Sequence, residues 1–397
     1  MVRPALGLIT LLLFPEAAAT AQTGRPITTV TLPGSPFGIA PTGDGQWVFV
    51  ALTQPPAIAV LHPAANRINL VRTVSLDEPP TGIALTHDGQ LLIAAAGPLV
   101  YFLDAGKLAS GVSLPLVGAI TDGANAGSVD VNVSPDDALA FVADENLQQL
   151  TVIDLNRARS NGFPASAIVG RIPTGEAPTQ ILLSADGQWL YVTGEAAPPA
   201  WGWPSACTQE GQTAIQTLVN PQGAITVANV ARAAADPANS VVANAPAGCS
   251  PVRMAASPAA DRLYVTARNN NAVLAFDTSR LISDPAHALL GSAPVGAAPV
   301  PVAVFEAGRL VLAGNSNRFQ GPNTPSTLSL LDAAQIAMGG NALLSTIPAG
   351  AFPRTLVLSP DRKTLYLANY GSNSLEAIDV ASIELAARPG SGNATLR

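Results

Sequence analysis

Charged residues, histidine and cysteine are scarce in this chain of 397 residues. Lysine, arginine, aspartate and glutamate make up 12% of the sequence, and there are three histidines and two cysteines. The formal net charge is −7 and basic residues do not cluster, which argues against a nucleic acid or an anionic membrane as partner. So few histidines also disfavour a histidine-ligated haem, a histidine-rich metal site and a histidine acid–base pair. We therefore expect no cofactor and no metal.

Long apolar runs are missing as well, apart from ten residues near the start. Ala5 to Phe14 is too short to span a bilayer roughly 30 Å thick, so no membrane insertion is expected. Arg3 precedes this run and Ala19-Thr20-Ala21 follows it, as in a secretory signal peptide with its cleavage site. We expect a signal peptide over residues 1–21, one folded domain over 22–385 and a flexible tail over 386–397. The mature protein is then a soluble monomer in the periplasm or the extracellular space.

One pattern is repeated seven times along the chain. In the clearest copy Pro353 opens an alternating strand, Ser359-Pro360-Asp361 forms a turn, and two more strands end at Asn369 and Asp379. A fourth strand precedes the start of the next copy. Four short strands per unit are typical of propeller blades, and internal repeats are strong indicators of fold. The sequence therefore predicts an all-β, seven-bladed β-propeller of four-stranded blades that begin at Pro36, Pro80, Ser128, Pro178, Pro251, Pro299 and Pro353.

The last copy lacks a convincing fourth strand after Asp379. Residues Ile27 to Gly34, which precede the first copy, have the pattern of that missing strand. If they pair with blade seven, the ring closes and leaves no long exposed strand edge. The alternative is a frayed N-terminal strand.

Both cysteines map to the same rim of adjacent blades. Cys207 lies in a long insertion between the second and third strands of blade four, and Cys249 lies just before the start of blade five. In an exported protein with two cysteines this placement predicts a disulfide, with two buried thiols as the alternative.

The insertion, from Glu195 to Gly223, also contains Trp201 and Trp203, which are half of the tryptophans in the chain. Connections of this length are usually functional or disordered. Two aromatic side chains on a rim loop can grip a protein partner or a ring-shaped ligand, or they can fold back over blade four. A second long loop of the same rim runs from Asn315 to Pro325 and includes Asn317, Arg318 and Asn323.

The same alignment predicts which residues lie at the mouth of the central channel. The third residue of each copy begins the innermost strand, and these residues are Gly38, Gly82, Asp130, Gln180, Arg253, Pro301 and Thr355. One position earlier, blade seven carries Arg354. Arg253 and Arg354, with Asp130 and Gln180, form a candidate site for a carboxylate or phosphate, because arginine offers paired donors in a fixed geometry. The alternative is an ion-pair lining in which Asp130 pairs with Arg253 or Arg354.

Few residues of the kinds used in catalysis map to the channel mouth. Each histidine (His62, His87 and His287) maps to the opposite rim or to strand ends. Asp144, Glu145 and Glu195 face the mouth without the spacing of metal ligands. A recurring aspartate follows the third strand in most copies, as Asp104, Asp154, Asp277, Asp332 and Asp379, and we interpret these residues as turn caps.

Segments such as Leu183-Ser184-Ala185-Asp186-Gly187-Gln188-Trp189-Leu190-Tyr191-Val192-Thr193 resemble the YVTN-type repeat of bacterial seven-bladed propellers. The resemblance covers almost the whole mature chain. The same superfamily includes proteins similar to lactonases of the 6-phosphogluconolactonase type and propeller units of quinoprotein and haem systems.

Two functions follow as expectations. The first is a non-catalytic, exported binding scaffold that holds a protein partner or a small organic acid on the rim with the blade-four insertion. The alternative, implied by the resemblance, is a hydrolase of a sugar-acid lactone at the channel mouth. In that case Arg253 and Arg354 hold the acid, and Asp130 or Glu195 is the base.

Overall fold

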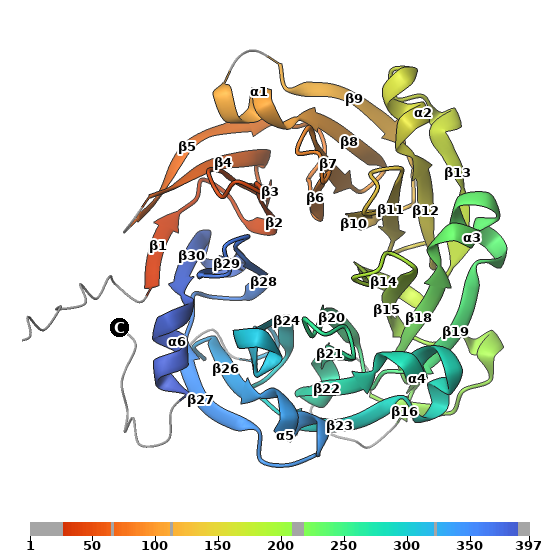
Figure 1. Ribbon diagram of the computed structural model, residues 1–397, viewed down its shortest axis with the longest axis vertical. Coiled ribbons are helices and arrows are strands. Elements are labelled where there is room, and N and C mark those ends of the chain that lie inside the picture. Colours follow the sequence, from red (N-terminus) through yellow and green to blue (C-terminus); the bar gives the residue numbers. More distant parts are fainter. Residues whose placement is uncertain (1–26, 65–66, 112–113, 209–217, 321–323, 388–397) are drawn as a thin grey trace, which may run out of the picture.

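The computed structural model describes residues 27–64, 67–111, 114–208, 218–320 and 324–387, which form a ring of antiparallel sheets around a central opening (Figure 1). Seven of the sheets have four strands each, as the repeat predicts, and an eighth, two-stranded sheet lies in the blade-four insertion. The predicted signal peptide and nearly all of the predicted tail lie outside the described residues.

The seven blades each place their first strand innermost. Blade one holds β2 (Pro36–Pro41), β3 (Val48–Thr53), β4 (Pro56–Ala64) and β5 (Arg67–Ser75), and blade two holds β6 (Ile83–Leu85), β7 (Leu91–Ala96), β8 (Leu99–Asp104) and β9 (Leu116–Thr121). Blade three holds β10 (Ser128–Val133), β11 (Leu139–Asp144), β12 (Gln149–Asp154) and β13 (Ile168–Pro173), and blade four holds β14 (Glu176–Leu183), β15 (Trp189–Ala196), β18 (Ala224–Asn229) and β19 (Val241–Pro246). Blade five holds β20 (Pro251–Ala256), β21 (Arg262–Ala267), β22 (Ala272–Asp277) and β23 (Leu289–Pro294), and blade six holds β24 (Pro299–Phe305), β25 (Leu310–Asn315), β26 (Thr327–Asp332) and β27 (Leu343–Pro348). Blade seven holds β28 (Pro353–Leu358), β29 (Thr364–Asn369), β30 (Ser374–Asp379) and β1 (Ile27–Thr31).

The ring closes as predicted. β1 pairs antiparallel with β30, and the five paired positions run from Ile27 opposite Ile378 to Thr31 opposite Ser374. Leu32, directly after β1, is buried and packs with side chains of blades one and seven. The first strand of the described chain thus completes the last blade.

The turn between the first two strands recurs with the same hydrogen bonds. In blade seven the Ser359 hydroxyl donates to the Asp361 carboxylate at 2.6 Å, and that carboxylate accepts from the Lys363 backbone N–H at 3.1 Å. Asp44, Asp88, Asp136 and Asp186 make the equivalent pair of bonds. These bonds explain why the aspartate recurs in the repeat.

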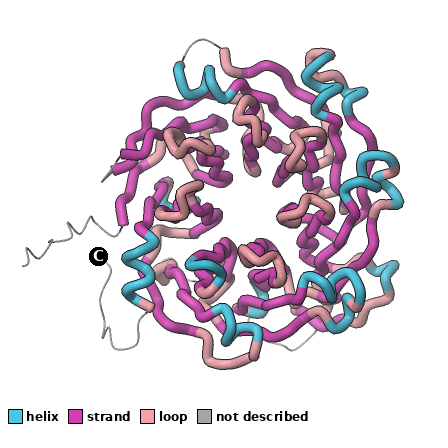
Figure 2. Tube along the Cα trace, in the orientation of Figure 1, coloured by secondary structure: helices cyan, strands magenta, loops and turns pink. Residues whose placement is uncertain are grey.

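Helices are the main feature of the fold that the sequence analysis missed. In the described part of the chain, six short helices lie on the outer side of the ring (Figure 2): α1 (Ala105–Ser110), α2 (Leu155–Ser160), α3 (Val230–Ala235), α4 (Thr278–Ser283), α5 (Ala333–Ala337) and α6 (Val380–Ala386). There are also 3₁₀ turns: η1 (Ala165–Ala167), η2 (Pro199–Trp201), η3 (Pro237–Asn239), η4 (Arg268–Asn270), η5 (Pro285–His287), η6 (Glu306–Gly308) and η7 (Tyr370–Ser372). Helices of five to seven residues are too short to produce a recognisable helical period.

The aspartates that follow the third strands are the N-caps of these helices. The Asp104 carboxylate, for example, accepts from the Lys107 N–H at 2.8 Å, and Asn229 does the same for Arg232 in blade four. Blade one has His62 at this position, and there β4 continues to Ala64 and pairs with β5. The interpretation of these aspartates as caps is confirmed, but they cap short helices and not turns.

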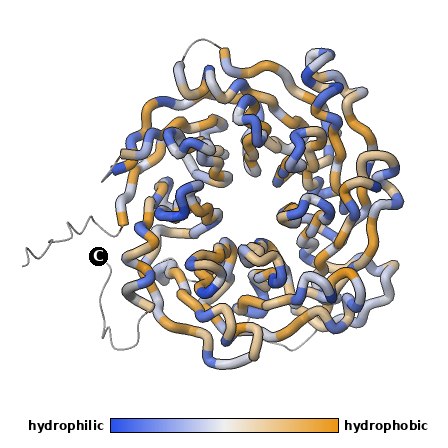
Figure 3. Tube along the Cα trace, viewed as in Figure 1, coloured by the Kyte–Doolittle hydropathy of each residue, from blue (hydrophilic) through white to orange (hydrophobic). Residues whose placement is uncertain are grey.

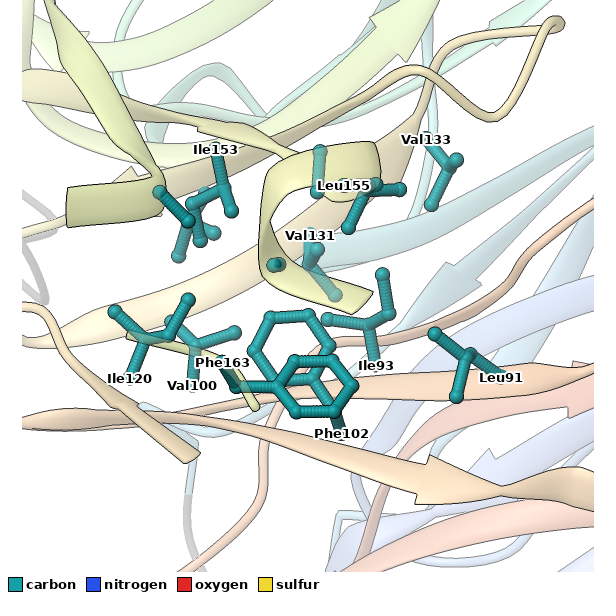
Figure 4. Packing of buried hydrophobic residues seen from close by; sticks show 14 of the residues in the cluster. Leu91, Ile93, Val100, Phe102, Ile120, Val131, Val133, Ile153, Leu155 and Phe163 are labelled. Carbon is teal, nitrogen blue, oxygen red and sulfur yellow. The ribbon is translucent and has the colours of Figure 1, made fainter. Parts of the chain in front are cut away.

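The hydrophobic core lies between neighbouring blades. One cluster combines Ile93 and Phe102 of blade two with Val131 and Ile153 of blade three (Figure 4). Phe163 stacks on Phe102, with ring centroids 4.5 Å apart. Strands are mostly hydrophobic, and many turns around the opening are hydrophilic (Figure 3). Each blade is therefore stabilised by burial against its two neighbours.

The predicted disulfide is present. Cys207, in β16 (Ser205–Cys207), is bonded to Cys249, and the two Cα atoms are 5.6 Å apart. β16 pairs with β17 (Asn220–Pro221), so the bond ties the two-stranded sheet of the insertion to the start of blade five.

We expect loss of this bond to lower stability without dismantling the sheets. Replacing Cys249 with alanine frees the insertion from blade five, and the 42-residue separation corresponds to about 4 kcal/mol in the chain-entropy model. Thermal melting should show a lower midpoint, whereas far-ultraviolet circular dichroism of the folded variant should match the wild type. Two thiols open to alkylation in the native wild-type protein would contradict the assignment.

Candidate functional site

The seven residues predicted at the channel mouth do line the channel, but most of them lie deeper than its mouth. They surround a cavity of about 370 Å³ at the level of the innermost strands. Gly82 is one of them, and a Cβ at this position would lie 2.4 Å from the Cα of Asp130. Glycine here permits the close approach of blades two and three at the axis.

A second cavity, of about 530 Å³, forms the mouth of the channel, and we refer to it as the mouth cavity. Its walls come from the second residue of the repeats and from residues at or just after the ends of the second strands. Its lining residues are Phe37, Thr53, Thr81, Glu145, Thr179, Glu195, Val252, Arg253, Arg268, Val300, Arg318, Phe352, Arg354 and Tyr370. Four guanidinium groups therefore face two carboxylates. This excess of positive charge suits an anionic ligand.

Arg354 lies against aromatic rings. Its guanidinium carbon is 4.1 Å from the centroid of Phe37 and 5.8 Å from that of Phe352. Within the described residues it forms no hydrogen bond or ion pair, and its Nε is buried. Burial lowers the pKa of Arg354 to about 9, and the charges of Arg253, Arg268 and Arg318 act in the same direction. The Arg354 guanidinium is thus a poorly solvated positive charge whose N–H donors are available to a ligand.

Arg253 has a more structural role than the sequence predicted. Its side chain is 8% exposed, and Nη1 donates to the backbone oxygen of Thr179 and, at 3.4 Å, to that of Val252. It lines both cavities and ties blade five to blade four. Replacing Arg253 is therefore expected to lower stability, because the Thr179 carbonyl is left without its donor.

Asp130 and Gln180 lie in the deeper cavity, not in the mouth. The Asp130 carboxylate accepts from the Ile181 N–H at 2.9 Å, and the Gln180 amide oxygen accepts from the Met254 N–H. Burial raises the pKa of Asp130 to about 6, while the charge of Arg253 opposes this shift. Across the described ranges Asp130 forms no direct ion pair with either arginine, so the predicted ion-pair lining is a longer-range interaction.

The carboxylates of the mouth cavity come from blades three and four. Glu195 forms an ion pair with Arg268 at 2.8 Å, and Arg268 is 4% exposed. Glu145 follows β11, and its backbone N–H donates to the Gly127 oxygen at 3.2 Å. Asp130 and Glu195, the candidate bases of the lactonase alternative, therefore line different cavities.

Trp201 and Trp203 do not line the mouth cavity. They are half-buried and contact each other edge to face, with ring centroids 5.2 Å apart. Trp201 ends η2, and Gly202 then adopts a left-handed conformation. A role of this pair in contacting a partner stays a prediction.

Sequence reasoning missed several residues of the mouth. Arg268 and Tyr370 directly follow second strands, so the repeat alignment contained the signal for them. Arg318 comes from the second long loop and lies 5.5 Å from the centroid of Phe352. Asn317 donates to the Pro325 oxygen in the same loop. Asn323 lies outside the described residues.

A buried acid pair lies beside the mouth, where Asp122 of the connection between blades two and three meets Asp144 of blade three. Asp122 and Asp144 are 6% and 0% exposed, and Thr151 hydrogen-bonds to both carboxylates. Arg171 reaches Asp122 at 3.1 Å. Burial raises the pKa of Asp144 to about 8, and the hydrogen bond and charge of Asp122 add to the effect. At neutral pH this carboxyl is therefore held largely protonated.

We expect the Asp144→Asn variant to change how stability depends on pH. Because the folded pKa of Asp144 is raised, its contribution to stability is complete below about pH 4 and is lost as pH rises through about 8. Asparagine mimics the protonated acid and does not titrate, so the stability of the variant relative to the wild type should be at least about 1 kcal/mol greater near pH 8 than near pH 5. Urea unfolding at both values measures this, and a difference independent of pH would contradict the account.

Within the described ranges no three histidine, cysteine, aspartate or glutamate side chains come together as a metal site. Nor does any helix there reach the length and apolarity required to cross a bilayer. The disulfide is consistent with an oxidising compartment.

Fold and site together define a seven-bladed β-propeller with an arginine-rich cavity at one end of its channel. Among solved structures, the chain is similar to hydrazine synthase of Kuenenia stuttgartiensis, with 18% sequence identity and a TM-score of 0.66. The alignment covers 91% of this chain and 99% of that chain. At this identity the similarity shows the fold alone. No family model and no curated protein matches the sequence.

Proposed function

We propose that this protein is a non-catalytic binding propeller that holds a small organic anion in the mouth cavity. The observation that carries the proposal is Arg354, a guanidinium stacked on aromatic rings without a hydrogen-bonding partner in the described structure. A carboxylate accepts two parallel bonds from such a group and offsets its desolvation. The cavity volume of about 530 Å³ lies in the usual range for small-molecule sites.

Several observations support a binding role over catalysis. The deeper carboxylate, Asp130, is directed to the backbone of Ile181, and Glu195 is neutralised by Arg268. A hydrolase of lactones needs a base beside the group that holds the acid. We further propose that the protein is exported, which the disulfide and the expected signal peptide support.

Calorimetry of the wild-type protein with carboxylic acids tests the proposal. A thermal-shift screen of monocarboxylates, dicarboxylates, sugar acids and sugar-acid lactones should first identify acids that stabilise the protein. Calorimetry should then show one saturable site per chain whose affinity falls with added salt. Failure of every acid to bind at millimolar concentration would contradict the proposal, and opening of a lactone faster than in buffer would favour the hydrolase.

Binding of the acid should strengthen as pH falls through about 6. Asp130 titrates near this value, and once it is neutral it no longer offsets the charge of Arg253 or repels the ligand. Asp130→Asn should bind several-fold more tightly than the wild type at pH 7.5 and equally well at pH 5. Calorimetry with an acid that is fully ionised over this range measures the effect. Parallel pH profiles of the two proteins would exclude Asp130 as the cause.

A further inference from the structure

The charges of the mouth cavity are separated by position around the ring. Arg268 and Arg253 come from blade five, Arg318 from blade six and Arg354 from blade seven. The two carboxylates come from blades three and four. Blades three and seven lie across the central opening from each other, as the positions of β11 and β28 show (Figure 1). The cavity is therefore electrically polar as well as positive overall.

Glu145 is the uncompensated acid of this cavity. Its half-buried side chain forms no ion pair and accepts no hydrogen bond within the described residues. Its negative charge nevertheless acts on Arg253 and Arg354. Burial lowers the pKa of each arginine, and the charge of Glu145 raises it. Glu145 thus lies near enough to the arginines to interact through the cavity, but not in direct contact with them.

Glu195 differs from Glu145 in this respect, because its carboxylate is bonded to Arg268 at 2.8 Å. One carboxylate, Glu145, and one guanidinium, Arg354, are therefore left to a ligand on facing sides of the cavity. A simple anion that binds Arg354 meets repulsion from Glu145. A ligand with a positive group on its other side converts this repulsion into attraction.

We infer that the ligand is a zwitterion of the amino-acid type. Its carboxylate binds Arg354, and its ammonium group donates to Glu145. This inference rests on the proposed function, since it assigns the second half of the same site. Phe37, Phe352 and Tyr370 supply apolar surface beside the carboxylate position.

Matched pairs of acids test the inference. Glutamate with glutarate, phenylalanine with 3-phenylpropanoate, and alanine with propanoate differ within each pair only by the α-amino group. Calorimetry on the wild-type protein at pH 7.5 should show at least about tenfold tighter binding of the amino acid in the pair that fits the cavity, the factor expected for a charged hydrogen bond. Glu145→Gln should reduce this preference to about threefold or less and leave affinity for the deaminated acid equal or higher.

Glu306→Gln is the matched control, because Glu306 follows β24 at the rim opposite the mouth and pairs with Arg309 there. It should leave the preference unchanged. Equal affinity within every pair, or a preference that survives in Glu145→Gln, would overturn the zwitterion while the anion site stands. If neither member of any pair nor any other acid binds, the proposed function fails with it.

Discussion

A variant that begins at Leu32 is expected to lose at least about 3 kcal/mol of unfolding free energy and to aggregate. It lacks β1, so blade seven has three strands and the edge of β30 is open. Ile27 and Val30 also leave the clusters against which they pack. A fully buried side chain of this kind contributes about 1.5–3 kcal/mol, and these two partly buried side chains contribute a share of that in addition to the lost pairing with β30. Urea unfolding and size-exclusion chromatography measure both effects.

A variant that begins at Gln22 keeps β1 and should behave as the wild type does. A synthetic peptide of residues 26–33, added to the variant that begins at Leu32, should restore much of the lost stability by pairing with β30. Full stability without β1 would show that the ring does not depend on closure by this strand.

The Arg354→Gln variant is expected to bind organic acids at least about tenfold more weakly than the wild type, with no loss of stability. A hydrogen bond to a charged group contributes about 1.5–3 kcal/mol, which sets the scale of the loss. Stability should be maintained or increased, because burial disfavours the charge that is removed and no hydrogen bond within the described residues is broken. Calorimetry and thermal melting measure the two quantities.

Two other arginines serve as references for Arg354. Arg253→Gln should lower stability, since the Thr179 oxygen loses its donor. Arg309→Gln removes a half-exposed arginine that lies outside the mouth and is paired with Glu306. This variant should change neither the affinity for organic acids nor the thermal stability. Unchanged acid binding in Arg354→Gln would remove the basis for an anion site at this position.

The sequence predicted the channel lining well because the repeat places one residue of each blade in an equivalent position. The seven innermost residues followed from alignment alone, and the Cys207–Cys249 bond followed from alignment together with the expected export. The same alignment placed the strand that closes the ring. Position around an axis is a property that a repeat conveys directly.

The contacts that each side chain makes at the mouth could not be predicted from the alignment. Arg253 is bound to the backbone of Thr179 and Arg354 stacks on Phe37, although both are arginines of inner strands. This difference depends on side-chain rotamers and on blades distant in sequence. Helix formation was missed for a different reason. A single capping residue, such as Asp104, determines a helix that is too short to leave a period in the sequence.

A crystal structure with the tightest-binding acid tests the central claim most directly. The account predicts an ordered carboxylate in the mouth cavity, with an oxygen within hydrogen-bonding distance of the Arg354 guanidinium. An ordered acid at another position, or a mouth cavity that stays empty at saturating acid, would contradict it.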